Sequence, residues 1–195
     1  MMKYLFLLFP FISIAQNSPA DVEQLRAEHL EELLDTSTHI LNLEEIEEFE
    51  GLDYFDYDSA YVITSKIKGC KGKPFEMVTT TERRPVYRKY GHIVFELNGV
   101  KNKLNVYQPV IDAKNKEYGD YLFIPFRDKT STHETYGGGR YIDMEVPTDK
   151  SVTIDFNLSY NPYCAYSYRY SCPVPPESNT MNIEIKAGEK TPLAH

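Results

Sequence analysis

From residue 60 onward, apolar and polar residues alternate in short runs, and this pattern has the period of a β-strand. Valine, isoleucine, threonine and tyrosine are residue types that strands favour. The predicted strands are residues 60–67, 75–81, 86–97, 100–108, 121–126, 140–146, 151–157 and 181–187. Several short strands with few helices favour an antiparallel sandwich or a partly open barrel, so the predicted fold is mainly β.

The clearest turn signal is the Asn-Gly dipeptide at 98–99, which is typical of a two-residue hairpin loop. A loop of that length pairs Ile93 with Leu104 on a mostly apolar face. It also pairs Glu96 with Lys101, a favourable pair of opposite charges, on the other face. Both features therefore predict the same register for this hairpin.

Two short helices are predicted before the strands. Ser18 can cap a helix that has Pro19 in its first turn and Asp21 three residues after the serine. Asn42 and Glu45 have the same spacing and predict the start of a second helix.

The first residues have the composition of a secretory signal peptide. Lys3 precedes an apolar run at 4–14 that is too short to span a bilayer, and small residues follow where a signal peptidase cuts. We predict a signal peptide at 1–15, an N-terminal helical segment at 16–50 and a single β-rich domain at 51–195. This organisation predicts export to the periplasm or the extracellular space, with no transmembrane span after signal removal. A buried N-terminal strand or an uncleaved anchor is the alternative.

Charge is distributed unevenly along the chain, whose formal net charge is −8. Residues 21–58 contain 14 acidic residues and one basic residue, Arg26. An acidic N-terminal part argues against nucleic-acid binding.

Cys164 and Cys172 are candidates for a disulfide, because exported proteins commonly contain them. Their spacing does not fit a zinc site, and no histidine in the sequence has ligand spacing to them, so we predict neither a metal nor a cofactor. A catalytic thiol would need a base, such as His92 or His133, beside it in space. Cys70 would then be the odd thiol.

Polar residues gather in three segments where connections between strands are expected: 127–131, 136–141 and 155–157. The three glycines at 137–139, followed by Arg140, could hold an anion with main-chain N–H groups and a guanidinium. The alternative is a bulge or tight crossover that needs a positive φ. Asp155 and its neighbour two residues on share a strand face, where they could hold a ligand or tether the next loop.

The segment from 158 to 180 has no regular pattern, and loops of this length are usually functional or ordered by their own packing. It is rich in tyrosine, at positions 160, 163, 166, 168 and 170. These side chains can pack the loop, and they also offer the hydroxyls and stacking faces that carbohydrate or aromatic ligands use. We interpret the tyrosines mainly as packing.

Two long stretches carry a family resemblance. LFIPFRDKTSTHETYGGGRYID at 122–143 and IDFNLSYNPYCAYSYRYSCPVPPESNTMNIEIKAGEK at 154–190 closely resemble the family called domain of unknown function 1684. The resemblance covers roughly 45–190 and is to the compact variant found in exported bacterial proteins. It implies no activity, because the family has none established. It also implies that members without export signals carry both cysteines, which counts against a purely disulfide role.

The motif residues predict where function lies. We expect a cluster that binds a small polar or anionic ligand, formed by Arg127, Asp128, Tyr136, Gly139, Arg140, Asp155, Asn157, Asn161, Asn179 and Glu189. One alternative is a hydrolase or transferase with an acid or base among Asp128, Asp155 and Glu189, and with Cys164 or Cys172 as a possible nucleophile. A second alternative is purely structural, with Arg140 and the acids forming a buried ion-pair network that anchors the long loop.

Overall fold

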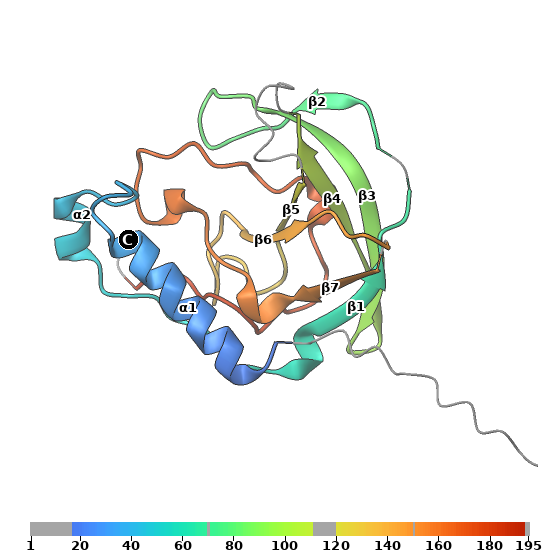
Figure 1. Cartoon of the computed structure of the whole chain (residues 1–195), viewed down its shortest axis with the longest axis horizontal. Coiled ribbons are helices and arrows are strands. Elements are labelled where there is room, and N and C mark those ends of the chain that lie inside the picture. The colour runs from blue at the N-terminus through green and yellow to red at the C-terminus, as the bar shows by residue number, and fades with distance from the viewer. Residues whose placement is uncertain (1–16, 70, 111–119, 150, 194–195) are drawn as a thin grey trace, which may run out of the picture.

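The computed structural model describes residues 17–69, 71–110, 120–149 and 151–193 (Figure 1). Its helices are α1 (Pro19–Leu34) and α2 (Leu43–Glu48), and its strands are β1 (Val62–Lys66), β2 (Pro74–Glu76), β3 (Val86–Leu97), β4 (Val100–Pro109), β5 (Tyr121–Phe126), β6 (Arg140–Glu145) and β7 (Ser151–Asp155). The predicted signal peptide and Cys70 lie outside the described residues. Among those described, no helix has both the length and the apolar character needed to cross a bilayer.

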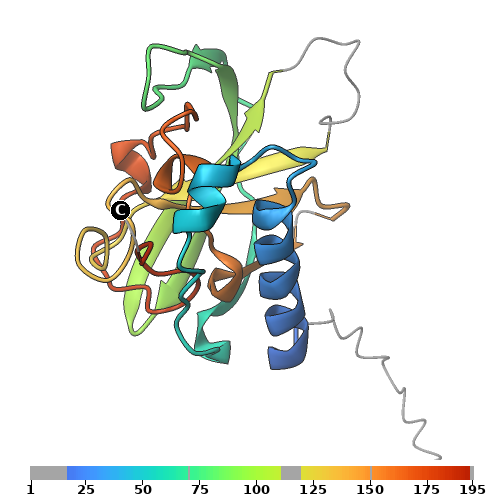
Figure 2. The ribbon, with the colours of Figure 1, turned by 90° about the vertical axis from the view of Figure 1, so that its left-hand side faces the viewer.

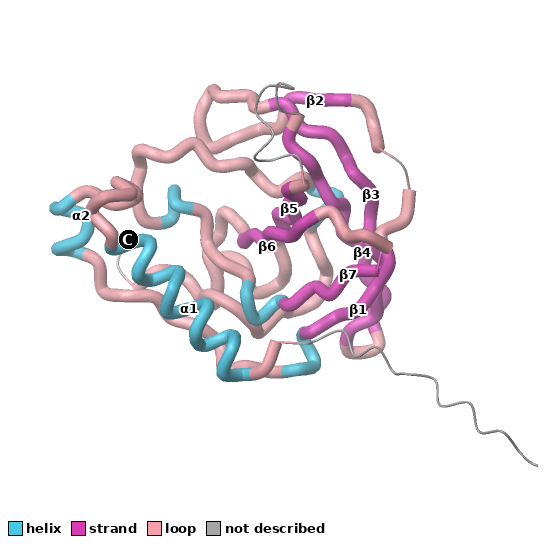
Figure 3. Tube along the Cα trace, in the orientation of Figure 1, coloured by secondary structure: helices cyan, strands magenta, loops and turns pink. Residues whose placement is uncertain are grey.

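The strands form two antiparallel sheets. One sheet has the order β2-β3-β4-β5-β6, and the other pairs β1 with β7. The five-stranded sheet ends at β2 and β6 and does not close on itself, so the predicted antiparallel sandwich is confirmed. Figure 3 shows the strands gathered on one side of the molecule, with the helices and long loops on the other.

The core fills the space between the sheets. It includes Ile93, Leu104 and Ile124 from the large sheet and Ile154 from β7, each exposed by 1% or less. Burial of this many aliphatic side chains is the main favourable term for folding.

The hairpin at 98–99 has the predicted register. Ile93 faces Leu104 and Glu96 faces Lys101. The two loop residues have φ values of 53° and 74°, the left-handed conformation that such a loop requires.

The prediction of a strand at 181–187 is wrong, although its alternating apolar side chains are buried as they would be in a strand. Met181, Ile183 and Ile185 are buried in the core. The carbonyl of Ile183 accepts a hydrogen bond from the Lys129 N–H, and the carbonyl of Ile185 accepts one from the Arg140 guanidinium. Their acceptors are therefore satisfied by a loop and a side chain instead of by a neighbouring strand.

The predicted strand at 75–81 is shorter in the structure, where β2 ends at Glu76. The residues that follow pair with the cysteine-containing loop. Thr80 N–H donates to the Cys172 carbonyl at 2.9 Å, and Val174 N–H donates to the Val78 carbonyl at 2.8 Å.

Both predicted helices are present, and each begins with a capping box, Ser18 with Asp21 and Asn42 with Glu45. Helix α1 lies beside the 3₁₀ turn η3 (Phe156–Leu158), which follows β7 (Figure 2). This contact places the helix against the irregular half of the molecule, where the candidate site is found.

Candidate functional site

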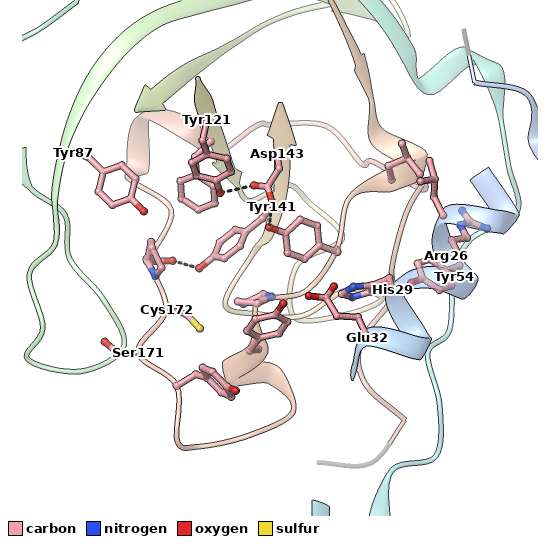
Figure 4. A pocket seen from close by; sticks show the side chains of 18 of the residues that line it. Arg26, His29, Glu32, Tyr54, Tyr87, Tyr121, Tyr141, Asp143, Ser171 and Cys172 are labelled. Carbon is pink, nitrogen blue, oxygen red and sulfur yellow. Dashed lines mark hydrogen bonds between the residues drawn. The ribbon is translucent and has the colours of Figure 1, made fainter. Parts of the chain in front are cut away.

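A pocket of about 600 Å³ lies between α1, one face of the large sheet and the loop after β7 (Figure 4). This volume is within the range of small-molecule sites. We call it the tyrosine pocket, because most of its aromatic lining residues are tyrosines: Tyr54, Tyr87, Tyr121, Phe123, Tyr141, Tyr160, Tyr163 and Tyr170.

Strand alternation positions the sheet side of the pocket. Tyr121 and Phe123 are two residues apart on β5, and Tyr141 and Asp143 are two residues apart on β6. Side chains two apart on a strand point to the same face, and Phe123 pairs directly with Asp143 across the ladder. The four side chains therefore share one face of the sheet.

The opposite side is formed by α1. His29 and Glu32 are three residues apart, so they lie on the same side of the helix. Figure 4 shows both side chains directed toward the pocket from the helix. The His29 ring lies 5.7 Å from the ring of Tyr160, measured between centroids.

Asp143 is the carboxylate of the sheet side. It accepts hydrogen bonds from the Tyr121 hydroxyl at 2.7 Å and from the Tyr160 hydroxyl at 2.6 Å. Its side chain is open to the pocket, but protein atoms surround it and displace water. This desolvation raises the pKa of Asp143 above 3.8, and the two hydroxyl donors oppose the rise.

Other tyrosine hydroxyls in the pocket also donate to the protein. Tyr141 donates to the Pro173 carbonyl, and Tyr170 donates to the Ile40 carbonyl at 2.9 Å. Tyr163 makes a hydrogen bond with the Glu32 side chain. Since each of these protons is used, the hydroxyl oxygens offer lone pairs to the cavity and therefore act as acceptors.

The basic residues of the pocket are also engaged. Arg26 donates to the carbonyls of Phe55 and Asn157 at 3.1 and 3.2 Å. Arg83 is exposed and donates to the Ser171 carbonyl at 2.7 Å. Burial lowers the pKa of His29, so this ring is neutral at pH 7, and its Nε2 has no hydrogen-bond partner among the described residues.

The residues predicted from the motifs lie elsewhere. Arg140 and Asp128 form an ion pair at 2.8 Å, with both side chains almost fully buried. Arg140 also donates to the carbonyls of Ile185, Ala187 and Glu189. The other Asp128 oxygen accepts hydrogen bonds from the main chain and the hydroxyl of Thr130. The arginine thus ties the C-terminal segment to the start of β6.

Asn161 and Glu189 form a neighbouring contact. The Asn161 N–H donates to Glu189 Oε2 at 2.8 Å, and Asn161 Nδ2 donates to the Lys190 carbonyl at 2.7 Å. Glu189 Oε1 and Asn161 Oδ1 are buried and have no partner in the described part of the chain. Burial raises the pKa of Glu189 to about 8.

Two further asparagines bridge segments on their own. Asn157 donates to Asp155 Oδ1 at 2.8 Å and exchanges hydrogen bonds with the main chain of Asp58. Asn179 bonds both main-chain groups of Asn105 and the carbonyl of Pro125, and so joins its turn to β4 and β5.

The glycine run forms a tight turn instead of an open loop. Gly139 has a φ of 92° and donates to the Tyr136 carbonyl at 3.0 Å. A Cβ at this position would lie 2.6 Å from the Phe126 carbonyl oxygen, so only glycine fits. Arg127 donates to the carbonyls of Gly137 and Pro175.

Within the described residues, none of the ten predicted binding residues lines this pocket or the second one, which lies beside α2. Their contacts favour the structural alternative, and their role in ligand binding stays a prediction. Of the cysteines, Cys172 lines the tyrosine pocket and Cys164 lies behind it, and both thiols are free in this structure.

Asp143, His29 and Glu32 were not predicted from the sequence, and the tyrosines of the pocket were interpreted mainly as packing. A signal for Asp143 was present in the aromatic residues Tyr121 and Tyr141. They lie on the strand face that points away from the core. Aromatic side chains on such a face indicate that another part of the protein packs over it.

A family model and a solved structure match this chain. A family model described as "Protein of unknown function (DUF1684)" matches residues 47–190. The chain is 33% identical to an uncharacterized protein of Haloarcula marismortui whose structure was determined by solution NMR. The TM-score is 0.66, and the match covers 90% of this chain and 95% of that protein. No curated protein matches the chain.

Proposed function

The chain belongs to the family described as "Protein of unknown function (DUF1684)", and we propose that it binds a small organic cation with a ring or other apolar portion in the tyrosine pocket. The observation that carries this proposal is the use of tyrosine protons in the pocket wall. Tyr121 and Tyr160 donate theirs to Asp143, and Tyr141 and Tyr170 donate theirs to protein carbonyls, so acceptors and aromatic faces remain for a ligand.

A ligand that donates hydrogen bonds fits such a surface. A protonated amine can donate to the free lone pairs of Asp143 and of the hydroxyl oxygens. Its charge is also attracted to the faces of tyrosine rings, an interaction of about 0.5–2 kcal/mol per ring. The apolar part of the ligand would stack against the remaining rings.

The hydrogen-bonding groups of the pocket support a cation over an anion. Asp143 and Glu32 face the cavity as acceptors. Arg26 and Arg83 keep their positive charge, but Arg26 is paired with Glu23 and both arginines donate to main-chain carbonyls. His29 adds no positive charge at pH 7, because burial keeps it neutral. An anionic ligand would therefore meet two carboxylates and would find few free donors.

The catalytic alternative has less support. Asp128, Asp155 and Glu189 do not line either of the two pockets described, and each is hydrogen-bonded within the protein. Cys164 contacts the Tyr136 hydroxyl, and in the described part of the chain no histidine is among the groups bonded to its thiol.

Export to the periplasm or extracellular space remains part of the proposal, and N-terminal sequencing of the mature protein tests it.

The amine proposal is tested by calorimetry with three probes of similar shape: 2-phenylethylamine, 2-phenylethanol and phenylacetate. We expect the amine to bind most tightly and the carboxylate least tightly. Asp143→Asn should weaken amine binding about tenfold, which corresponds to about 1.4 kcal/mol. Glu145→Gln is the matched control, because it removes an exposed carboxylate of the same strand that does not line the pocket. Equal affinity for the amine and the alcohol would overturn the proposal.

The same experiment has a pH dependence. A cation binds best to ionised Asp143. Amine affinity should therefore fall as the pH falls through the pKa of this group, which lies above 3.8. Tyr121 and Tyr160 contact Asp143, and Tyr87 and Tyr163 lie near it. Their pKa values are raised, so they remain neutral over this range. Asp143→Asn should make the dependence markedly weaker without removing it, because Glu32 and His29 also face the cavity.

A further inference from the structure

Cys164 and Cys172 are in contact at the wall of the tyrosine pocket, which Cys172 lines and Cys164 does not. The Cys164 N–H donates to Cys172 Sγ at 3.3 Å, and the two thiols are hydrogen-bonded to each other. Both side chains are more than nine-tenths buried. Two thiols already in hydrogen-bond contact need only a local shift to become covalently joined.

The surroundings of the two thiols are unequal. The Cys164 sulfur is hydrogen-bonded by the Cys172 thiol, the Tyr136 hydroxyl and the Thr80 side chain, and these contacts lower the pKa of Cys164 to about 7. The same contact with Cys164 raises the pKa of Cys172. Cys164 is therefore the sulfur that can react as a thiolate, whereas Cys172 keeps its proton.

The pair is also connected to the pocket. Cys172 and its neighbours Ser171 and Pro173 line the cavity. The Pro173 carbonyl accepts the hydrogen bond of Tyr141, whose ring lies 4.7 Å from that of Phe123. A shift at Cys172 therefore acts on the residue that holds Tyr141 in place.

We propose that Cys164 and Cys172 are a reversible redox site for low-molecular-weight disulfides and thiols, and that its state sets the packing of Tyr141 in the pocket wall. In the first step, a small disulfide enters through the pocket at Cys172, and the Cys164 thiolate beside that residue attacks it, forms a mixed disulfide and releases one small thiolate, which takes up a proton. Cys172 then loses its proton and attacks Cys164 Sγ, and the second small thiol leaves. The protein loses two hydrogens and two electrons are transferred to the small disulfide.

The chemistry is tested on the full chain carrying Cys70→Ser, so that the third cysteine cannot react. Incubation with oxidised glutathione should remove the mass of two hydrogens, join the peptides that contain Cys164 and Cys172, and be reversed by reduced glutathione. Adding Cys172→Ser should stop the reaction at a glutathione adduct on Cys164. Adding Cys164→Ser should slow the reaction at least tenfold. Thiols that stay reduced in excess oxidised glutathione, or an adduct that forms faster on Cys172, would overturn the proposal.

The effect on the pocket wall is tested by NMR of the protein labelled on its tyrosine rings. The Tyr141 signal is identified by its loss in Tyr141→Phe. It should shift on oxidation and return on reduction, whereas Tyr57, which bonds Asn17 outside the pocket, should not shift. A Tyr141 signal that is identical in both redox states rules out the coupling. These measurements use no ligand, so they test the redox proposal independently of the amine proposal.

Discussion

Replacing Arg140 with methionine is expected to lower the free energy of unfolding by about 3–5 kcal/mol, the usual cost of removing one partner of a buried ion pair. The substitution leaves the Asp128 carboxylate buried without its cation. It also removes the donor for the carbonyls of Ile185, Ala187 and Glu189. A loss of this size is a large fraction of the stability of a typical domain, so the variant should be marginally folded at 37 °C.

Urea unfolding measures this loss as a lower midpoint with an unchanged slope. Lys129→Ala is the matched control, because it removes an exposed cation next to Asp128 and should change stability by less than about 0.5 kcal/mol. The double variant Arg140→Met with Asp128→Asn should be more stable than Arg140→Met alone, since its buried amide is neutral. If Arg140→Met were as stable as the Lys129 control, the structural role would be wrong and Arg140 would return as a ligand-binding candidate.

The parts of the fold that could be predicted depend on information that is local in the sequence. The Asn-Gly dipeptide at 98–99 and the charge pair of Glu96 with Lys101 both specify the hairpin within a few residues. The capping boxes at Ser18 and Asn42 are equally local. Such signals are sufficient because the groups that pair or form hydrogen bonds with each other lie within a few residues in the sequence.

The segment 181–187 shows what a local sequence pattern cannot predict. Alternation correctly predicted which side chains are buried, since it reports on burial. It does not report which group will bond the main chain. Here one acceptor is bonded by Arg140, a side chain 45 residues from Ile185 in sequence. The strand prediction was wrong for this reason.

The candidate site was missed for a related reason. The polar motif residues were recognised, but the sequence does not say whether a buried polar group bonds a ligand or the protein's own main chain. Conversely, Asp143 was not among the predicted binding residues. Tyr160, which donates to it, is 17 residues away, and helix α1, which lines the same pocket, ends at Leu34, so only the assembled fold brings these groups around one cavity.

The second large effect is expected from Glu189→Gln, which should remove a loss of stability that develops as the pH rises from about 4.5 to about 8. The folded-state pKa of Glu189 is about 8, whereas the ordinary value is 4.5. Between these two values the unfolded chain releases the proton and the folded protein keeps it. The free energy of unfolding therefore falls as the pH rises, by as much as ~1.4 kcal/mol per pH unit for this group. Below the ordinary pKa the carboxyl is protonated in both states, and this penalty is absent.

Glutamine keeps the neutral form at every pH. Its carbonyl can still accept from the Asn161 N–H, and its amide can donate in the place where Asn161 Oδ1 has no partner among the described residues. In thermal unfolding from pH 5 to pH 9, the stability difference between Glu189→Gln and wild type should grow up to about pH 8 and then level off. All other titrating groups are shared, so they cancel in this difference. Glu184→Gln, which removes an exposed carboxylate, should give a curve parallel to that of the wild type. A parallel curve for Glu189→Gln as well would mean that Glu189 is ionised in the folded protein. Its negative charge would then have to be balanced by Arg140, and the buried network would hold two carboxylates around one guanidinium.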